Sequence, residues 1–551
     1  MKRVMSGLAA LGTVVAMLAI PVSAVADPGS APSAPAGTGA ISWGRCSEAD
    51  LRAAGAQCGY LSVPLNYSNP TGPQIQLAVS RILHKSKPKN YQGVLITNPG
   101  GPGGAGLDLN TFLIPVLKQE GFKAAANDYD WIGFDPRGVG ASIPAISCEP
   151  DYLGPDRPNY VPWTPSLLTT WESRSESYAS ACANQSAKQT ALLHNMTTVD
   201  NAEDINSIRE ALGVSQITYY GFSWGTDLGQ TYATLYPQTI RRLILDSNVN
   251  MTRPGFDDFN LDQDGPFNTN EDDWFAWLAK YHSVYHLGTT EAAVQNLFYN
   301  TEEALENHPA GGVVGPDEWV DTFQEAAYYE ETWVEWGQVF SDYINEHKTK
   351  PLVELYDAVD SPGNDNELAV YLSVLCTDSA WPTDWDTWTS SSWAEFQVAP
   401  YETWGNTWFN GPCQSWPVAG GPQFQVNGDG IQNALLIDET GDAATPFEGS
   451  LVTRQLFPNS VLLAEPGGTS HADSLEGDLC VDGTIANYLT TGQLPPRQPG
   501  SGPDLTCPPI PVPVPPSSAG AAKSAQSVAT ATLARQGRTT TPRELPAVPA
   551  S

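Results

Sequence analysis

The sequence is poor in basic residues. It contains 27 lysines and arginines against 61 aspartates and glutamates, for a formal net charge of −34 at pH 7. Nucleic acids and anionic membrane surfaces repel a chain of this charge, so we expect neither as a partner. The acidic excess either keeps the protein soluble or marks a cleft that attracts a cationic group, and the net charge leaves both interpretations open.

The sequence also lacks any apolar run that approaches the ~20 residues needed to span a bilayer. A shorter apolar run, residues 8–22, follows two basic residues and precedes an Ala-Val-Ala sequence that ends at Ala26. This order is typical of a secretory signal peptide, which we place at residues 1–26. We therefore expect a secreted, extracellular protein without a membrane anchor, and we take it to be a monomer.

Two segments have compositions that cannot build a packed core. Residues 27–40 are rich in Pro, Ala, Gly and Ser, and we interpret them as a linker or propeptide. Residues 508–551 are rich in Pro, Ala, Ser and Thr and have no apolar period, which predicts a disordered tail. The folded part should lie between residues 41 and 507.

Cys-x-x-Cys pairs are absent, which argues against zinc ribbons and dithiol redox motifs. The eight cysteines are an even number, and cysteines of an exported chain usually pair as disulfides. About 105 pairings are formally possible, and we favour pairing between neighbours along the chain, each bridge closing a local loop. We expect no metal and no cofactor.

A glycine-rich loop is present, but it lacks the Gly-Lys-Ser/Thr ending of a phosphate-binding loop. The loop, residues 98–106, directly follows a predicted buried strand at residues 93–97. Its backbone N–H groups are free to face an anion. A flexible turn is the plain alternative, but a loop that binds an oxyanion beside a nucleophilic serine explains the pattern better.

Ser223 stands at the centre of a Gly-x-Ser-x-Gly sequence, Gly221 to Gly225. A predicted strand, residues 216–220, leads into it, and a helix-forming run, residues 228–235, follows. The glycines permit a bend in which the backbones approach too closely for side chains. These flanks favour a nucleophile elbow over the alternative, a surface turn with an ordinary serine.

Strands and helices alternate along most of the chain, which predicts a mostly parallel α/β sheet. Residues 250–425 break the alternation: they are mainly helical and acidic and hold 12 of the 17 tryptophans. We predict an α/β-hydrolase fold with a core at residues 41–249 and 426–507 and an inserted helical lid at residues 250–425. The lid tryptophans either pack its core or line a substrate channel.

A nucleophilic serine needs a base, and that base needs an acid to orient it. The α/β-hydrolase order is serine, acid, histidine. Of the seven histidines, only His471 follows the lid, in a glycine-rich loop after a predicted strand. Asp442, Asp438 and Asp473 compete as the acid, and we favour Asp442 because its loop position gives the carboxylate room to reach the imidazole.

The oxyanion of the reaction needs N–H donors from the backbone near Ser223. We predict the N–H of Trp224, which follows the serine, and that of Gly101 in the glycine-rich loop. Gly100 replaces Gly101 if that loop is turned differently.

A set of motifs occurs along the chain in a fixed order. They are Asn98-Pro99-Gly100-Gly101-Pro102-Gly103, Asp135-Pro136-Arg137-Gly138, Gly221-Phe222-Ser223-Trp224-Gly225-Thr226, Gly441-Asp442-x-x-Thr445-Pro446 and Gly468-x-x-His471. As a set they resemble the secreted bacterial tripeptidyl aminopeptidase group of α/β-hydrolases, relatives of the prolyl aminopeptidases, over residues 41–507. Asn98-Pro99 departs from the His-Gly of prolyl aminopeptidases, and Ala472 follows His471 where glycine is more usual.

The resemblance implies a serine exopeptidase that releases short N-terminal fragments, tripeptides in this group. Ser223 would attack the scissile carbonyl, His471 would accept and return the proton, and Asp442 would orient His471. The free N-terminus of the peptide substrate would need acidic side chains of the lid. Glu330 and Asp378 are the candidates by their place in stretches similar to the group, with solvated or salt-bridged acids as the plain alternative.

Two other functions fit parts of the sequence. A secreted carboxylesterase could use the same fold and the same three residues, because fold does not fix function. A catalytically inactive binding protein is the third hypothesis, and a complete serine, aspartate and histidine set in the family order argues against it. The sequence leaves open the preferred residues and the length of the released fragment.

Overall fold

A single sheet of ten strands organises the computed structural model, which describes residues 39–516. The strand order is β1-β2-β3-β5-β4-β6-β7-β8-β9-β10. From β5 to β10 all neighbours pair in parallel, whereas β1, β2 and β3 pair antiparallel with one another and with β5. The strands are β1 (Gly44–Arg45), β2 (Gln57–Pro64), β3 (Gln74–Ile82), β4 (Gly93–Asn98), β5 (Tyr129–Asp135), β6 (Ile217–Phe222), β7 (Ile240–Asp246), β8 (Ala434–Glu439), β9 (Ser460–Glu465) and β10 (Leu505–Thr506). The predicted mostly parallel sheet is confirmed.

Helices cover both faces of the sheet, because successive strand residues point to opposite faces. On β4, Leu95 packs into one apolar cluster, and its neighbours Val94 and Ile96 pack into the other. The helices on the Leu95 side are α1 (Ala49–Ala54), α2 (Asn110–Gln119), α3 (Lys123–Asn127) and α19 (Leu479–Thr491). Those on the opposite side include α6 (Thr198–Ala211) and α7 (Trp224–Leu235), and α18 (Glu448–Leu456) connects β8 to β9.

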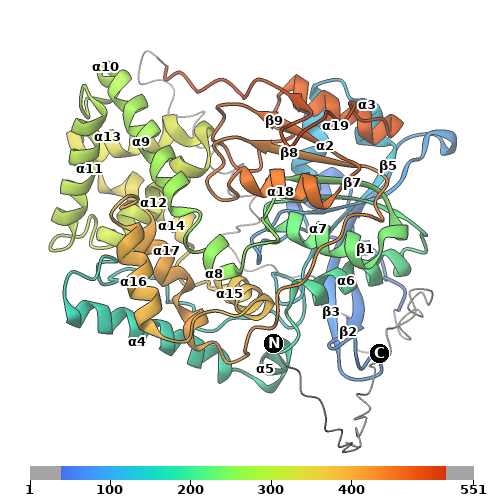
Figure 1. Cartoon of the computed structure of the whole chain (residues 1–551), viewed down its shortest axis with the longest axis horizontal. Helices are drawn as coiled ribbons and strands as arrows, with labels where there is room; N and C mark the ends of the chain where they lie inside the picture. The colour runs from blue at the N-terminus through green and yellow to red at the C-terminus, as the bar shows by residue number, and fades with distance from the viewer. Residues whose placement is uncertain (1–38, 517–551) are drawn as a thin grey trace, which may run out of the picture. The chain divides into compact units, whose positions relative to one another are not determined.

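The lid contributes ten α-helices between β7 and β8 (Figure 1). They are α8 (Gly255–Asp258), α9 (Asp264–Lys280), α10 (His282–Tyr285), α11 (Glu291–Leu305), α12 (Pro316–Tyr328), α13 (Trp333–Glu346), α14 (Thr349–Asp360), α15 (Asn366–Asp378), α16 (Trp385–Glu395) and α17 (Thr403–Asn410). Short 3₁₀ turns η3 (Glu330–Thr332) and η4 (Gly411–Ser415) complete it.

Tryptophans of the lid pack its own core. Trp274, Trp319 and Trp336 are fully buried in an apolar cluster of lid residues, where Trp319 meets Phe323 at a ring-centroid distance of 4.7 Å. Trp277 and Trp333 belong to the same cluster. The packing interpretation of these five tryptophans is therefore confirmed.

A segment that precedes β6 in the chain also packs against the lid. Helix α4 (Pro165–Ala183) lies beside η4, and the ring of Trp171 stacks on Trp408 with centroids 5.6 Å apart. The guanidinium of Arg157, just before α4, forms ion pairs of 2.7–3.0 Å with three lid carboxylates: Asp321, Asp360 and Glu318. The lid therefore packs against side chains that precede β6 in the sequence. Helix α5 (Ala187–Leu193) connects α4 to α6.

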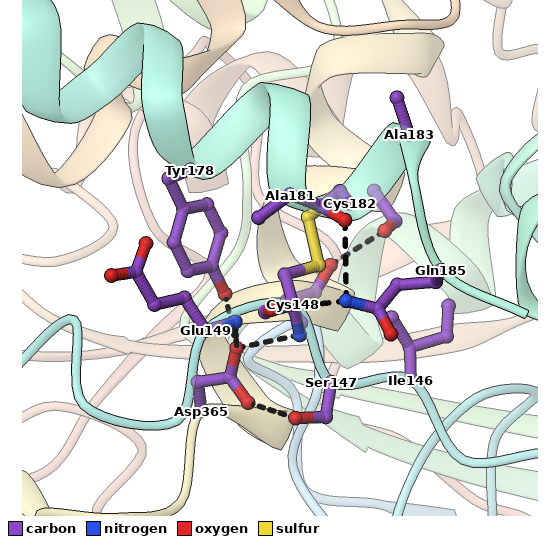
Figure 2. Close-up of a disulfide and its surroundings, with 12 residues drawn as sticks. Ile146, Ser147, Cys148, Glu149, Tyr178, Ala181, Cys182, Ala183, Gln185 and Asp365 are labelled. Atoms are coloured by element: carbon purple, nitrogen blue, oxygen red, sulfur yellow. Dashed lines mark hydrogen bonds between the residues drawn. A yellow bond between two sulfur atoms is a disulfide. The ribbon is translucent and has the colours of Figure 1, made fainter.

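Four disulfides join neighbouring cysteines along the chain. They are Cys46–Cys58, Cys148–Cys182, Cys376–Cys413 and Cys480–Cys507. The predicted neighbour pairing is confirmed. Figure 2 shows the Cys148–Cys182 bridge, which fastens the chain before α4 to the end of that helix, next to the carboxylate of Asp365 at the start of α15.

The predicted terminal segments are only partly described. Residues 508–516, the start of the predicted disordered tail, instead reach the lid, because the indole Nε1 of Trp277 donates to the carbonyl of Pro513 at 2.9 Å. The signal peptide predicted at residues 1–26, positions 27–38 of the predicted linker and positions 517–551 of the tail lie outside the described residues. Across residues 39–516, no helix is long and apolar enough to cross a membrane.

Candidate active site

Ser223 occupies the corner between β6 and α7. Its backbone has φ 56° and ψ −129°, a conformation that non-glycine residues rarely adopt. A Cβ on Gly221 would lie 2.2 Å from the carbonyl oxygen of Gly225, and a Cβ on Gly225 would lie 2.8 Å from Asn98 Oδ1. Both flanking glycines are therefore needed for the close approach of backbones that the sequence predicted.

His471 and Asp442 come together in the loops after β9 and β8. Nδ1 of His471 lies 2.8 Å from Asp442 Oδ2 and 3.0 Å from Oδ1. Thr445 donates to the same carboxylate twice, through its N–H and its hydroxyl, at 2.9 Å each. The backbone N–H of His471 donates to the carbonyl of Tyr328, the last residue of α12, at 2.9 Å. The lid thus contacts the histidine directly.

Of the three competing aspartates, Asp442 makes the hydrogen bonds to Nδ1 of His471. Asp438 instead accepts a hydrogen bond from the hydroxyl of Ser450. Burial, and then the charge of Asp442, raise the pKa of Asp438 well above its usual range. Asp473 faces Glu439, where burial and then Asp473 raise the pKa of the glutamate to about 11.

Ser223 and His471 line one cavity of about 270 Å³ between the sheet and the lid. Gly101 and Phe222 line it from the core, and Tyr328 lines it from the lid. No tryptophan is among the lining residues of the described chain. Phenylalanines and tyrosines of the lid, among them Phe267, Tyr329 and Phe409, line it instead.

The glycine-rich loop packs directly on the serine. A Cβ on Gly100 would lie 2.8 Å from the Cβ of Ser223 and 3.2 Å from the backbone nitrogen of Trp224. The N–H of Gly100 donates to Asn98 Oδ1 at 3.0 Å. Within residues 39–516, the N–H groups of Gly101 and Trp224 donate to no acceptor. The arrangement favours Gly101 over Gly100 as an oxyanion donor.

The two acids predicted to bind a substrate amine do not line the cavity. Asp378 accepts from the N–H and the hydroxyl of Thr198 at 2.8 and 2.6 Å, and burial raises its pKa to about 7. The same hydroxyl accepts from the indole Nε1 of Trp224 at 3.1 Å. Glu330 accepts from the hydroxyl of Thr469 at 2.9 Å, two residues before His471. Asp378 is thus engaged at the first residue of α6 and Glu330 in the loop before His471, and a role of either acid in binding an amine stays a prediction.

Other acids do line the cavity: Asp321, Asp360, Glu367, Glu402 and Glu476. The first two are paired with Arg157. Glu402, which exposes 6% of its surface, accepts from Gln324 Nε2 at 2.6 Å and forms no salt bridge within the described chain. Burial, and then Asp264 and Asp321, raise its pKa well above the usual range. No sequence pattern distinguishes Glu402 from the many other lid acids.

In the described part of the chain, no group of three or more His, Cys, Asp or Glu side chains is arranged to hold a metal ion.

The fold and the site define a serine hydrolase of the α/β type. The family model described as "alpha/beta hydrolase fold" matches residues 93–478. A tripeptidyl aminopeptidase of Streptomyces lividans is 38% identical over 462 residues, which cover 82% of this chain and 84% of that protein. This chain therefore belongs to the α/β hydrolase family, in the group of the tripeptidyl aminopeptidases, and the resemblance seen in the motifs is confirmed.

More distant relatives carry different names. Serine protease Hip1 of Mycobacterium tuberculosis (strain ATCC 25618 / H37Rv) is 28% identical over 483 residues, 83% of this chain and 90% of that protein. A protein named carboxylesterase B, from the same strain, is 28% identical over 497 residues, 85% of this chain and 91% of that protein. Peptidase and esterase names thus both occur among the relatives.

Proposed function

We propose that this protein is an exported serine exopeptidase that removes short fragments, tripeptides by likeness to the Streptomyces relative, from peptides with a free N-terminus. One observation carries the proposal: a single cavity is lined by Ser223, by His471 with its aspartate partner, and by an unpaired lid carboxylate, Glu402. Four disulfides support export, since they persist in oxidising compartments.

Ser223 is the nucleophile of the proposed reaction. Its Oγ attacks the scissile carbonyl carbon while Nε2 of His471 takes the hydroxyl proton. Asp442 holds the Nδ1–H tautomer that leaves Nε2 free as an acceptor and stabilises the imidazolium that forms. The N–H groups of Gly101 and Trp224 hold the oxyanion.

Collapse of this tetrahedral intermediate expels the leaving peptide. The imidazolium of His471 returns its proton to the departing amine, and the N-terminal fragment remains as an ester on Ser223. Water, deprotonated by the same imidazole, then attacks the ester carbonyl. The fragment leaves with a new carboxylate, and the serine regains its proton.

We assign the α-ammonium of the substrate to Glu402. Arg157 already neutralises part of the charge of Asp321 and Asp360, whereas Glu402 receives a neutral amide. An ammonium beside this buried carboxylate would favour its charged form, because opposite charges stabilise each other strongly in a site shielded from water. A substrate with a blocked amine lacks that interaction.

The test compares release from a free-amine tripeptide reporter with release from its N-acetylated twin. The free-amine reporter should react at least tenfold faster, and Glu402→Gln should reduce that ratio toward one, since a buried charge-assisted contact contributes on the order of 1.5–3 kcal/mol. Glu476→Gln is the matched control, a carboxylate in the same cavity whose replacement should keep the ratio. Equal rates for both reporters in the wild type would contradict the exopeptidase proposal.

Carboxylesterase activity is the second candidate, favoured by the relative of that name. A simple aryl ester and the aryl amide of a free tripeptide separate the two functions. An esterase would hydrolyse the ester and leave the tripeptide amide intact, whatever the state of its amine.

A further inference from the structure

A second carboxylate, that of Asp246, lies behind the histidine loop. Asp246 ends β7 and exposes 1% of its surface. Its carbonyl accepts the N–H of Ser223 at 2.9 Å. The backbone of Asp246 is therefore hydrogen-bonded to the backbone of the nucleophilic serine.

The side chain of Asp246 reaches the loop that carries His471. Oδ2 accepts the N–H of Ser474 at 3.1 Å, and the hydroxyl of Ser474 donates to the same oxygen. That hydroxyl also bonds the phenol oxygen of Tyr220 on β6. One buried carboxylate thus fixes the loop three residues beyond the histidine.

The next residue, Ser247, holds the loop at a second point. Its Oγ accepts the N–H of Ala472 at 2.8 Å, directly after His471. Ala472 has φ 56°, in the left-handed region that costs energy for a side chain other than glycine. Hydrogen bonds from the end of β7 therefore hold the loop at Ala472, where the backbone has this costly conformation, and at Ser474.

We propose that Asp246 is a positioning residue for His471, which it acts on in two ways: through Ser474 it fixes the loop, and its negative charge stabilises the imidazolium. Asp442 bonds Nδ1 itself, whereas Asp246 makes no hydrogen bond to the ring among the described residues. The inference rests on the proposed function, because it assumes that His471 is the base.

The electrostatics agree with this role. Burial raises the pKa of Asp246 to about 6, and the two bonds from Ser474 and the nearby His471 oppose that rise. No salt bridge reaches Asp246 within residues 39–516. The other titratable groups that face it from neighbouring elements are Asp442, Asp438, Glu465 and Tyr220. An imidazolium is therefore the natural counter-charge for Asp246 when the reaction creates one.

Asp246→Asn tests the role, because an amide oxygen in the place of Oδ2 can accept both bonds from Ser474 while the negative charge is lost. We expect kcat to fall about tenfold with KM unchanged, the size of a modest charge interaction in a buried site. We also expect the acidic limb of the pH profile of kcat/KM to move to lower pH, because a base without the nearby negative charge is harder to protonate.

Asp438→Asn is the matched control. Asp438 is equally buried near the end of the adjacent strand, and burial, with Asp442 next, raises its pKa well above the usual range. Its carboxylate bonds Ser450 and not the loop that carries His471. The acidic limb of the pH profile of kcat/KM should lie at the same pH in Asp438→Asn as in the wild type. If the acidic limb of Asp246→Asn lies at the same pH as that of the wild type, the inference is overturned, whatever the value of kcat.

Active sites are counted with a serine-directed phosphonate, so misfolded protein does not enter kcat. If Asp246→Asn does not fold, Ser474→Ala replaces it: this variant keeps the carboxylate and loses its hydroxyl link to the loop. A kcat per labelled site lowered severalfold with unchanged KM is expected, and an unchanged kcat overturns the inference. If the wild type neither hydrolyses the reporter nor takes up the label at Ser223, the proposed function is overturned as well. If the wild type is active, the variants test the role of Asp246 alone.

Discussion

Replacing Asp365 tests how the lid is held beside the cavity. Figure 2 shows its carboxylate receiving four donors at the Cys148–Cys182 bridge. Oδ2 accepts from the N–H of Cys148 at 2.7 Å, the N–H of Glu149 at 2.6 Å and the hydroxyl of Tyr178 at 2.9 Å, and Oδ1 accepts from the hydroxyl of Ser147 at 2.6 Å. Asp365 exposes 3% of its surface, so its carboxylate is shielded from bulk water.

The magnitude follows from this count of donors. A hydrogen bond to a charged group contributes about 1.5–3 kcal/mol, and a buried N–H left without an acceptor costs about 1–3 kcal/mol. Asp365→Ala leaves two N–H groups and two hydroxyls without their acceptor. We expect a loss of about 4–6 kcal/mol after allowing for partial relaxation, a large share of the ~5–15 kcal/mol by which a typical protein is stable.

Two milder variants make the comparison quantitative. Asp365→Asn can put its amide oxygen where Oδ2 stood and its NH₂ toward Ser147, so we expect a loss of only about 1–2 kcal/mol. Tyr178→Phe removes one donor and should cost about 1 kcal/mol. Urea unfolding followed by tryptophan fluorescence measures all three, because most tryptophans lie in the lid.

The same variants have a kinetic signature. Asp365 directly precedes α15, whose first residues, Asn366, Glu367 and Leu368, line the cavity. Asp365→Ala should therefore raise KM for the free-amine reporter even at temperatures where the protein is folded. If Asp365→Ala unfolded at the same urea concentration as Tyr178→Phe, the carboxylate would not be what holds α15, and the reasoning would be refuted.

Three further predictions concern the cavity and the elbow. Asp442→Asn should lower kcat about 10³–10⁴-fold with little change in KM, because the amide favours the wrong imidazole tautomer; stopped assays with the tripeptide reporter measure it. KM for that reporter should depend on pH, because burial raises the pKa of Glu402 and only the charged carboxylate attracts the protonated amine, and Glu402→Gln should abolish this dependence. Gly221→Ala should yield no phosphonate-reactive protein, because its Cβ would lie 2.2 Å from the carbonyl oxygen of Gly225; labelling equal to wild type would contradict this.

The residues that a sequence can reveal are those that obey a local rule. Ser223 lies between glycines that only a tight corner needs, and His471 and Asp442 follow predicted strands in the family order. Their geometry in the structure, with Nδ1 2.8 Å from the carboxylate, agrees with the predicted pairing. Neighbour pairing of cysteines succeeded for a similar reason, since short loops close at the least entropic cost.

The residues that the sequence did not reveal are brought together only by the fold. Arg157 precedes β6 and neutralises lid acids more than 150 positions later in the chain. Which lid carboxylate stays without a cation depends on that distant arginine, so composition could not select Glu402. Glu330 and Asp378 were chosen by likeness to family stretches, and the structure places both against hydroxyl and N–H groups of supporting loops.

The four disulfides span 12, 34, 37 and 27 positions, in each case between cysteines that follow one another along the chain. In a polypeptide that emerges N-terminus first, the first cysteine of each pair is followed directly by its own partner. An oxidase that joins cysteines in order of arrival would therefore make the native set, without a later step of bond exchange.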